Sequence, residues 1–329
     1  MKRFLAGDIG GTKVIMALYE VEGDQITQTA EKRYVSAEHA TFTEILVDFR
    51  KEHDAPVAAT GLGVAGPVFD RRCQATNLPW VIDARELEAS QPVGRVALVN
   101  DFKAAALGVL HLKPGEWVDL NPGTTQPHGP IAVLGAGTGL GQALLFYSDK
   151  RYHVVPTEGG HKDFAPRTDD EIGLLKFLRE RHGRVSYERV LSGAGLHAVY
   201  DYVVTTRTSP ELAEVRDAMA KEDAAAVISQ WGQSGKDPNC VKALDIFATV
   251  YGAEAGNLAL QIVATGGVYL TGGIGPKNVG KLLDGSFLKG YLTKGRFSKM
   301  VADIPCKLVT NKNVGLLGAA AAAMELEQL

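Results

Sequence analysis

The sequence is poor in cysteine, and its three cysteines form no CxxC pair. Cys73, Cys240 and Cys306 are far apart along a chain of 329 residues. Structural zinc sites and disulfide frameworks need cysteines at characteristic short spacings or in larger numbers. The sequence therefore predicts reduced thiols and a cytoplasmic location.

Two further features are missing, a long apolar run and a cluster of basic residues. No apolar stretch approaches the roughly 18 residues of a membrane span, and the N-terminus lacks the apolar core of a signal peptide. Lys and Arg together number 35 against 38 for Asp and Glu, a net charge of −3. Without a basic run to pair with phosphates, nucleic acid is not an expected partner. A membrane is not expected as a partner either.

The length of the chain favours two lobes. At 329 residues the chain is long for a single hydrophobic core, so two lobes with a crevice between them are expected. The smaller α/β lobe is expected to consist of residues 1–112 and 313–329. The larger α/β lobe, residues 113–312, is expected to carry additional helices. The active site is expected in the cleft between the lobes.

Hydrophobic periodicity predicts an antiparallel meander at the start of the first lobe, followed by further helices and strands. Turns rich in glycine and polar residues at 10–12 and 22–24 separate the first three strands. Apolar residues from Phe42 to Phe49 then recur at the spacing of an amphipathic helix. The predicted elements are strands Phe4–Asp8, Val14–Val21, Ile26–Tyr34, Val57–Val64 and Val96–Val99, helix Thr41–His53 and a helix ending at Leu110.

The second half of the chain begins with a hairpin, residues 131–147, that repeats the order strand, glycine turn, strand seen at the N-terminus. On pattern alone, chance likeness between two α/β hairpins explains this as well as a relation between two lobes does. Helical patterns follow, and the chain closes with a short strand and an alanine-rich helix. The predicted elements are helices Asp169–Arg181, Ala194–Thr205, Glu211–Trp231 and Val241–Val263, strand Lys307–Val309, and a last helix to Met324.

The glycine-rich turn between the first two predicted strands is the sharpest motif. Its glycines let backbone N–H groups approach phosphate oxygens, and its threonine adds a hydroxyl donor. Its aspartate suits Mg²⁺, held through water, because Mg²⁺ takes oxygen ligands and keeps much of its hydration shell. A plain tight hairpin is the simpler explanation of a lone Gly-Gly turn. The motif consists of Gly7, Asp8, Ile9, Gly10, Gly11 and Thr12.

A second glycine-rich turn, GAGTGLG at residues 135–141, joins the strands of the later hairpin. It is not the dinucleotide-binding fingerprint, because Leu140 replaces the last glycine and a strand follows instead of a helix. A Walker A motif is also absent from the sequence. Two glycine hairpins would instead hold a polyphosphate from both sides. The residues expected to bind nucleotide here are Gly135, Gly137, Thr138 and Gly139, with Gly272 and Gly273 of a third glycine turn near the adenosine.

Three polar segments stand out in apolar surroundings. Asn100 and Asp101 follow a buried strand, where open α/β sheets place ligand-binding side chains, although Asp101 also suits the N-cap of the next helix. Glu158 and His161 flank a Gly-Gly pair, and a structural histidine is the usual interpretation of such an imidazole. Glu188 on its own reads as a solvated helix residue.

Taken together, these motifs resemble in order and spacing the bacterial-type glucokinase family of the hexokinase and actin-like ATPase superfamily. The resemblance covers nearly the whole chain and implies a two-lobed, actin-like ATPase (ribonuclease H-like) α/β architecture. The matching motifs are GDIGGT, GVAGP (63–67), VNDF (99–102), GAGTGLG, EGGHKDFAP (158–166), YERVLSG (187–193), LTGGI (270–274) and NVGLLGAAA (313–321).

The resemblance implies a chemistry, which is phosphoryl transfer from ATP to the 6-hydroxyl of D-glucose, giving glucose 6-phosphate and ADP, with Mg²⁺ as cofactor. GDIGGT and GAGTGLG would be phosphate loops, and Asp101 would be the catalytic base. The implied partners are D-glucose and ATP, and the expected assembly is a homodimer. The side chains implied to bind the sugar hydroxyls are Asn100, Asp101, Glu158, His161 and Glu188.

Other functions stay open at this stage. Lys13 stands where this family often has asparagine and the related ROK kinases often have lysine. ROK kinases carry a cysteine-rich zinc motif after their Gly-His pair, whereas Lys-Asp-Phe-Ala-Pro follows His161. A kinase for mannose or an N-acetylated hexosamine is the alternative enzyme. A non-catalytic sugar-sensing regulator should carry an N-terminal DNA-binding domain, for which the first strand, close to Met1, leaves no room. An actin-like structural ATPase would not need the polar pocket.

Overall fold

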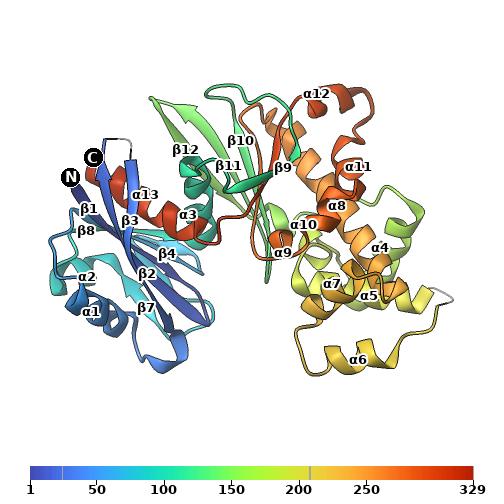
Figure 1. The fold of residues 1–329 in the computed structure, drawn as a ribbon, viewed down its shortest axis with the longest axis horizontal. Coiled ribbons are helices and arrows are strands. Elements are labelled where there is room, and N and C mark those ends of the chain that lie inside the picture. Colours follow the sequence, from blue (N-terminus) through green and yellow to red (C-terminus); the bar gives the residue numbers. More distant parts are fainter. Residues whose placement is uncertain (24, 207–208, 329) are drawn as a thin grey trace. The chain divides into compact units, whose positions relative to one another are not determined.

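The computed structural model describes residues 1–23, 25–206 and 209–328 (Figure 1). The chain divides into two compact units. Unit 1 consists of residues 1–116 together with the C-terminal segment from 311, and unit 2 consists of residues 117–310.

Unit 1 is built on a five-stranded sheet with the order β3-β2-β1-β4-β8. The first three strands form an antiparallel meander, whereas β1, β4 and β8 run parallel. A second, three-stranded sheet is formed by short strands between β4 and β8. The strands are β1 (Lys2–Ile9), β2 (Lys13–Glu22), β3 (Gln25–Val35), β4 (Ala59–Val64), β5 (Val68–Phe69), β6 (Arg72–Gln74), β7 (Val81–Asp83) and β8 (Arg95–Asn100).

Helices cover both faces of the five-stranded sheet (Figure 1). On one face, α1 (Phe42–Glu52) and α2 (Ala84–Ser90) bury their apolar side chains against β1, β2 and β4. On the other face, α13 (Val314–Gln328) packs on β1 and β4 and lies beside α3 (Asp101–Gly108). Small residues permit this approach, because a Cβ at Gly61 would lie 1.7 Å from the carbonyl oxygen of Ala319.

Unit 2 is built on a six-stranded sheet with the order β12-β11-β10-β13-β14-β9. The long helix α8 (Pro238–Ile262) lies on one face and forms the centre of the unit's largest apolar core. The other strands and helices of the unit are β9 (Trp117–Asn121), β10 (Ile131–Ala136), β11 (Leu140–Ser148), β12 (Arg151–Thr157), β13 (Gly267–Thr271), β14 (Cys306–Val309), α4 (Asp169–His182), α5 (Gly193–Thr206), α6 (Ala213–Met219), α7 (Ala224–Gln233), α9 (Ile274–Lys277), α10 (Val279–Leu283), α11 (Ser286–Leu292) and α12 (Ser298–Ala302).

Most predicted elements are confirmed to within a few residues, and one helix is not. The predicted helix Glu211–Trp231 is in fact α6 and α7, because the Asp223 side chain caps a new helix by accepting a hydrogen bond from the Ala226 amide at 2.7 Å. The predictions missed β12, which has no buried residue and contains Pro156. They also missed the short strands β5 to β7 and β9 and the short helices α2 and α9 to α12. The turn expected at 22–24 includes residue 24, which lies outside the described residues.

Cys73, Cys240 and Cys306 are buried free thiols. Among the residues that the structure describes, none of the helices combines the length and the apolar character of a membrane-crossing segment.

Candidate functional site

The predicted site residues of unit 1 lie at one edge of its sheet. Ile9, Val64 and Asn100 are in register across the parallel strands β1, β4 and β8, at or near the carboxyl end of each. The residues that follow these three positions therefore come together at the same edge. They include Gly10, Gly11 and Thr12 of the GDIGGT turn, and Asp101.

Three hydrogen bonds, to Lys13 and from Ser36, hold the backbone of the GDIGGT turn in place. The Gly10 amide donates to the Lys13 carbonyl oxygen at 3.0 Å. Ser36 donates from its hydroxyl to the Gly10 carbonyl and from its amide to the Thr12 carbonyl, at 3.0 and 3.1 Å. Within the described residues the amides of Gly11 and Thr12 form no hydrogen bond, so the turn can donate them to an anion.

Asn100, not Asp101, is the N-cap of α3. The Asn100 Oδ1 atom accepts from the amides of Phe102 and Lys103 at 3.0 and 3.2 Å. Its Nδ2 donates to the Gly66 carbonyl oxygen at 3.2 Å and to Asp101 Oδ1 at 2.9 Å. The interpretation of Asp101 as the cap is therefore wrong, and its carboxylate is available for another role.

Asp101 is half-buried, and neighbouring residues hold one oxygen of its carboxylate, Oδ1, by hydrogen bonds. Oδ1 accepts from the Phe102 amide at 2.8 Å as well as from Asn100. In the described part of the chain, no other residue donates a hydrogen bond to Oδ2. Burial raises the pKa of Asp101 above its ordinary value. A carboxylate with one oxygen held by neighbouring residues and with a raised pKa suits a general base.

Asp8 lies close enough to Asp101 for their charges to interact. Burial, and then the charge of Asp101, raise the pKa of Asp8 to about 6, while Lys13 lowers it. A carboxylate whose ionisation is disfavoured by burial and by a second carboxylate fits a divalent cation, which would stabilise both charges. The described residues contain no cluster of three or more metal-ligating side chains. Asp8 and Asp101 could hold Mg²⁺, because this ion commonly takes one or two carboxylates and completes its shell with water and substrate phosphates.

We predict that Asp8→Asn makes the protein more stable at neutral pH. Because the folded-state pKa is about 6 and the ordinary value 3.8, the penalty for ionising Asp8 is absent below the lower value and complete above the higher one. Its full size is about 3 kcal/mol as an upper limit. Urea unfolding should therefore show a larger free energy of unfolding for the variant at pH 7.5, with a smaller gain at pH 5.

Asp48→Asn is the matched control for this prediction. Hydrogen bonds from Lys32 and Tyr34 hold the pKa of the exposed Asp48 below its ordinary value. Its ionisation is therefore favourable in the folded state, and the variant should show no gain in stability at neutral pH. Equal stability of Asp8→Asn and wild type at pH 7.5 would show that the charge of Asp8 carries no cost.

The predicted nucleotide-binding turns of unit 2 also lie together. Gly135 of β10 is in register with Thr271 of β13, so the turns that follow these two strands are neighbours. Gly272 has a φ of 85°, and a Cβ there would lie 2.4 Å from the Ala136 carbonyl oxygen, so glycine is required. The structure thus brings the predicted turn residues to one sheet edge, namely Gly135, Gly137, Thr138, Gly139, Gly272 and Gly273.

Glu158, His161 and Glu188 form a group on unit 2. His161 Nε2 lies 3.9 Å from Glu158 Oε2, and His161 Nδ1 lies 3.8 Å from Glu188 Oε1. The His161 side chain is 57% exposed, so it is not a core histidine. Glu188 is in a 3₁₀ turn, 187–189, and its Oε2 accepts from the Leu140 amide at 2.9 Å. Glu188 is therefore held by the second glycine hairpin and is not a freely solvated residue.

Sequence reasoning missed several residues that support these groups. Ser36 braces the first turn, and Gln142, Lys162 and Glu254 lie next to the Glu158 group. Glu254 gave a signal, because a single acidic residue in the apolar segment 250–256 of a helix needs a buried partner.

Comparison with known proteins agrees with these motifs. The profile of the glucokinase family matches residues 5–326. A glucokinase of Nostoc sp. is 37% identical over 99% of this chain and 100% of its own length, and one of Cronobacter sakazakii is 35% identical over 97% and 96%. The crystal structure of a glucokinase from an Antarctic psychrotroph is 30% identical and covers 99% of each chain with a TM-score of 0.89. The chain belongs to the glucokinase family.

Proposed function

We propose that this protein is a glucokinase that transfers the γ-phosphoryl group of ATP to the 6-hydroxyl of D-glucose, giving glucose 6-phosphate and ADP. The observation that carries the proposal is the Asp101 carboxylate, whose Oδ1 is held by Asn100 and the Phe102 amide while no other described residue donates to Oδ2. Full-length similarity to glucokinases supports the same conclusion.

Asp101 would act as the general base. Its Oδ2 would take the proton of the sugar 6-hydroxyl as that oxygen attacks the γ-phosphorus. General-base help of this kind contributes about 10²- to 10⁴-fold in rate. The raised pKa of Asp101 makes it a better proton acceptor than an ordinary, exposed aspartate.

The remaining sugar hydroxyls would be bound by Asn100, Glu158, His161 and Glu188. Sugar hydroxyls both donate and accept hydrogen bonds, so carboxylates, an amide and an imidazole are suitable partners. Glu158 and His161 have exposed side chains, as direct ligands need before a substrate binds.

The glycine turns and Asp8 would serve the nucleotide. Amides of the GDIGGT and GAGTGLG turns would donate to phosphate oxygens, and Gly272 and Gly273 would lie against the adenosine. Asp8 would hold Mg²⁺ through a shared water molecule, since this ion keeps much of its hydration shell and Asp8 lies close to a second carboxylate, that of Asp101. Bound Mg²⁺ neutralises charge on the transferred phosphoryl group.

We also propose the architecture, cellular location and oligomeric state that the resemblance to this family implies. The architecture would be that of an actin-like, ribonuclease H-like ATPase, and the protein would be a cytoplasmic homodimer that binds no nucleic acid. The three buried free thiols support a reducing compartment, and the net charge of −3 supports the absence of a nucleic-acid surface. Light scattering on the purified protein tests the dimer.

A panel of sugars with coupled detection of ADP tests the proposed function. Glucose should give the highest kcat/KM among glucose, mannose, N-acetylglucosamine and N-acetylmannosamine, with formation of glucose 6-phosphate. A preference for another hexose would identify a kinase of different specificity. Glucose binding without ADP formation would identify a sugar-sensing protein, and either result would overturn the proposal.

A further inference from the structure

A fully buried carboxylate lies behind the Glu158 group in unit 2. Glu254, on α8, has no exposed surface. Its Oε1 forms an ion pair with Lys162 Nζ at 2.5 Å and accepts a hydrogen bond from Gln142 Nε2 at 2.8 Å, and its Oε2 accepts from Asn257 Nδ2 at 3.1 Å. A buried charge needs such complete pairing, because the loss of one partner leaves it uncompensated.

The first two partners of Glu254 hold the segment that carries Glu158 and His161. Lys162 directly follows His161 in the chain. The Gln142 carbonyl oxygen accepts from the Thr157 hydroxyl at 3.1 Å, and that hydroxyl accepts from the Gly159 amide at 3.1 Å. A Cβ at Gly159 would lie 2.1 Å from Gln142 Oε1, so the Gln142 side chain lies directly against this turn.

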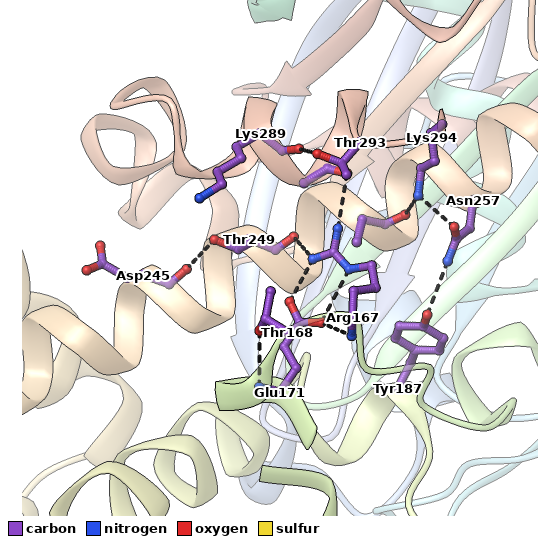
Figure 2. A network of polar contacts seen from close by, with 12 residues as sticks. Arg167, Thr168, Glu171, Tyr187, Asp245, Thr249, Asn257, Lys289, Thr293 and Lys294 are labelled. Carbon is purple, nitrogen blue, oxygen red and sulfur yellow. Dashed lines mark hydrogen bonds and ion pairs between the residues drawn. The ribbon is translucent and has the colours of Figure 1, made fainter. Parts of the chain in front are cut away.

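The third partner, Asn257, connects Glu254 to the segment that carries Glu188. Asn257 Nδ2 also donates to the Tyr187 hydroxyl at 3.1 Å, and Tyr187 directly precedes Glu188 (Figure 2). Lys294 Nζ fixes the orientation of this amide by donating to Asn257 Oδ1 at 2.7 Å and to the Ala253 carbonyl oxygen at 2.7 Å. Lys162 Nζ also lies 5.7 Å from the centre of the Tyr187 ring.

We propose that Glu254 is a positioning residue for the sugar, because it holds the Glu158–His161 turn through Lys162 and Gln142 and the Glu188 segment through Asn257. The two segments come from different parts of the chain, and the ion pair and hydrogen bonds of one carboxylate join them. The inference rests on the proposed function, because it takes Glu158, His161 and Glu188 as the sugar ligands.

Glu254→Gln tests the inference with little change in volume. The amide keeps one acceptor but loses the charge that holds Lys162, so the sugar ligands should be less well placed. The KM for glucose should rise roughly tenfold, within the range of about 10²-fold that a misplacement of about an ångström can cost. The KM for ATP should stay within about twofold, because ATP is assigned to other residues. Lys162→Met removes the cation of the same ion pair, so it should also raise the KM for glucose and leave the KM for ATP nearly unchanged.

Glu171→Gln is the matched control, because Glu171 is another buried carboxylate of unit 2 with a cationic partner. Arg167 Nη2 donates to Glu171 Oε1 at 2.7 Å (Figure 2). In the part of the chain that the structure describes, neither Arg167 nor Glu171 forms a hydrogen bond or ion pair with the three sugar ligands. Breaking this pair should therefore lower the melting temperature and leave both KM values unchanged.

The outcomes separate the inference from the proposed function. KM does not depend on the fraction of enzyme that is folded, so it can be measured even where Glu254→Gln lowers the yield. Wild-type enzyme that fails to phosphorylate glucose would overturn the proposed function. Active wild-type enzyme together with an unchanged glucose KM in Glu254→Gln and Lys162→Met would overturn only the inference. An equal rise in glucose KM in Glu171→Gln would also overturn it, since any buried ion pair would then have the same effect.

Discussion

Asp101→Asn should lower kcat for glucose phosphorylation by at least a hundredfold and leave glucose binding nearly unchanged. The amide keeps the oxygen that accepts from Asn100 and the Phe102 amide, so the start of α3 should stay folded. It cannot accept a proton in the reaction, and general-base help is worth about 10²- to 10⁴-fold. Steady-state kinetics give kcat, and calorimetric titration with glucose gives the binding constant.

Asp83→Asn is the matched control for this substitution. Asp83 also lies at the start of a helix of unit 1, and it caps α2 by accepting from the Arg85 amide at 2.9 Å. Asparagine is an equally good N-cap, so kcat should not change. A fall in kcat of less than tenfold in Asp101→Asn would exclude the assigned role of Asp101 as base.

The pH dependence of the wild-type rate provides a second check on the same group. The base must be ionised to act, so kcat/KM should fall as the pH is lowered through the pKa of Asp101. Because burial raises that pKa, the fall should occur at a higher pH than for an exposed aspartate. Asp8, with a pKa of about 6, titrates nearby, so the observed midpoint belongs to the coupled pair.

The parts of the fold that the sequence predicts well are those decided by local patterns. The first two strands of the meander are continuous apolar runs joined by a glycine turn, and α1 has a regular apolar stripe. The GDIGGT and GAGTGLG motifs fall on tight turns for the steric reason that glycine permits close approach. Local pattern also put Asn100 and Asp101 at the junction of a strand and a helix, where the structure has them.

The parts that local patterns do not predict depend on contacts between distant residues. Glu188 reads as solvated from its neighbours, yet its carboxylate is held by the amide of Leu140, 48 positions away. Asp101 reads as an N-cap, but the preceding Asn100 has that role because its side chain reaches two amides of α3. Glu254 and Gln142 are 112 positions apart, and the local sequence around either residue does not predict contact with the other.

His161→Ala and Thr12→Ala should have effects of opposite kind on the two substrates. If His161 binds a sugar hydroxyl, its loss leaves that hydroxyl unpaired at a cost of about 1 to 3 kcal/mol. The KM for glucose should then rise by roughly 5- to 150-fold, while the KM for ATP hardly changes. Thr12→Ala removes a phosphate donor, so it should raise the KM for ATP and leave glucose affinity, measured without nucleotide, near that of wild type.

His197→Ala controls for the loss of an exposed imidazole from unit 2. His197 lies on α5 with Nε2 at 3.6 Å from Asp201 Oδ1, and its exposure of 45% is close to that of His161. Its replacement should leave both KM values unchanged.

If His161 instead had only a structural role, His161→Ala would have a lower melting temperature and both KM values would be unaltered. The 57% exposure of the His161 side chain argues against that outcome, because an imidazole open to solvent contributes little to a core. An unaltered glucose KM in His161→Ala would therefore remove His161 from the sugar site and leave Glu158 and Glu188 as the ligands of unit 2.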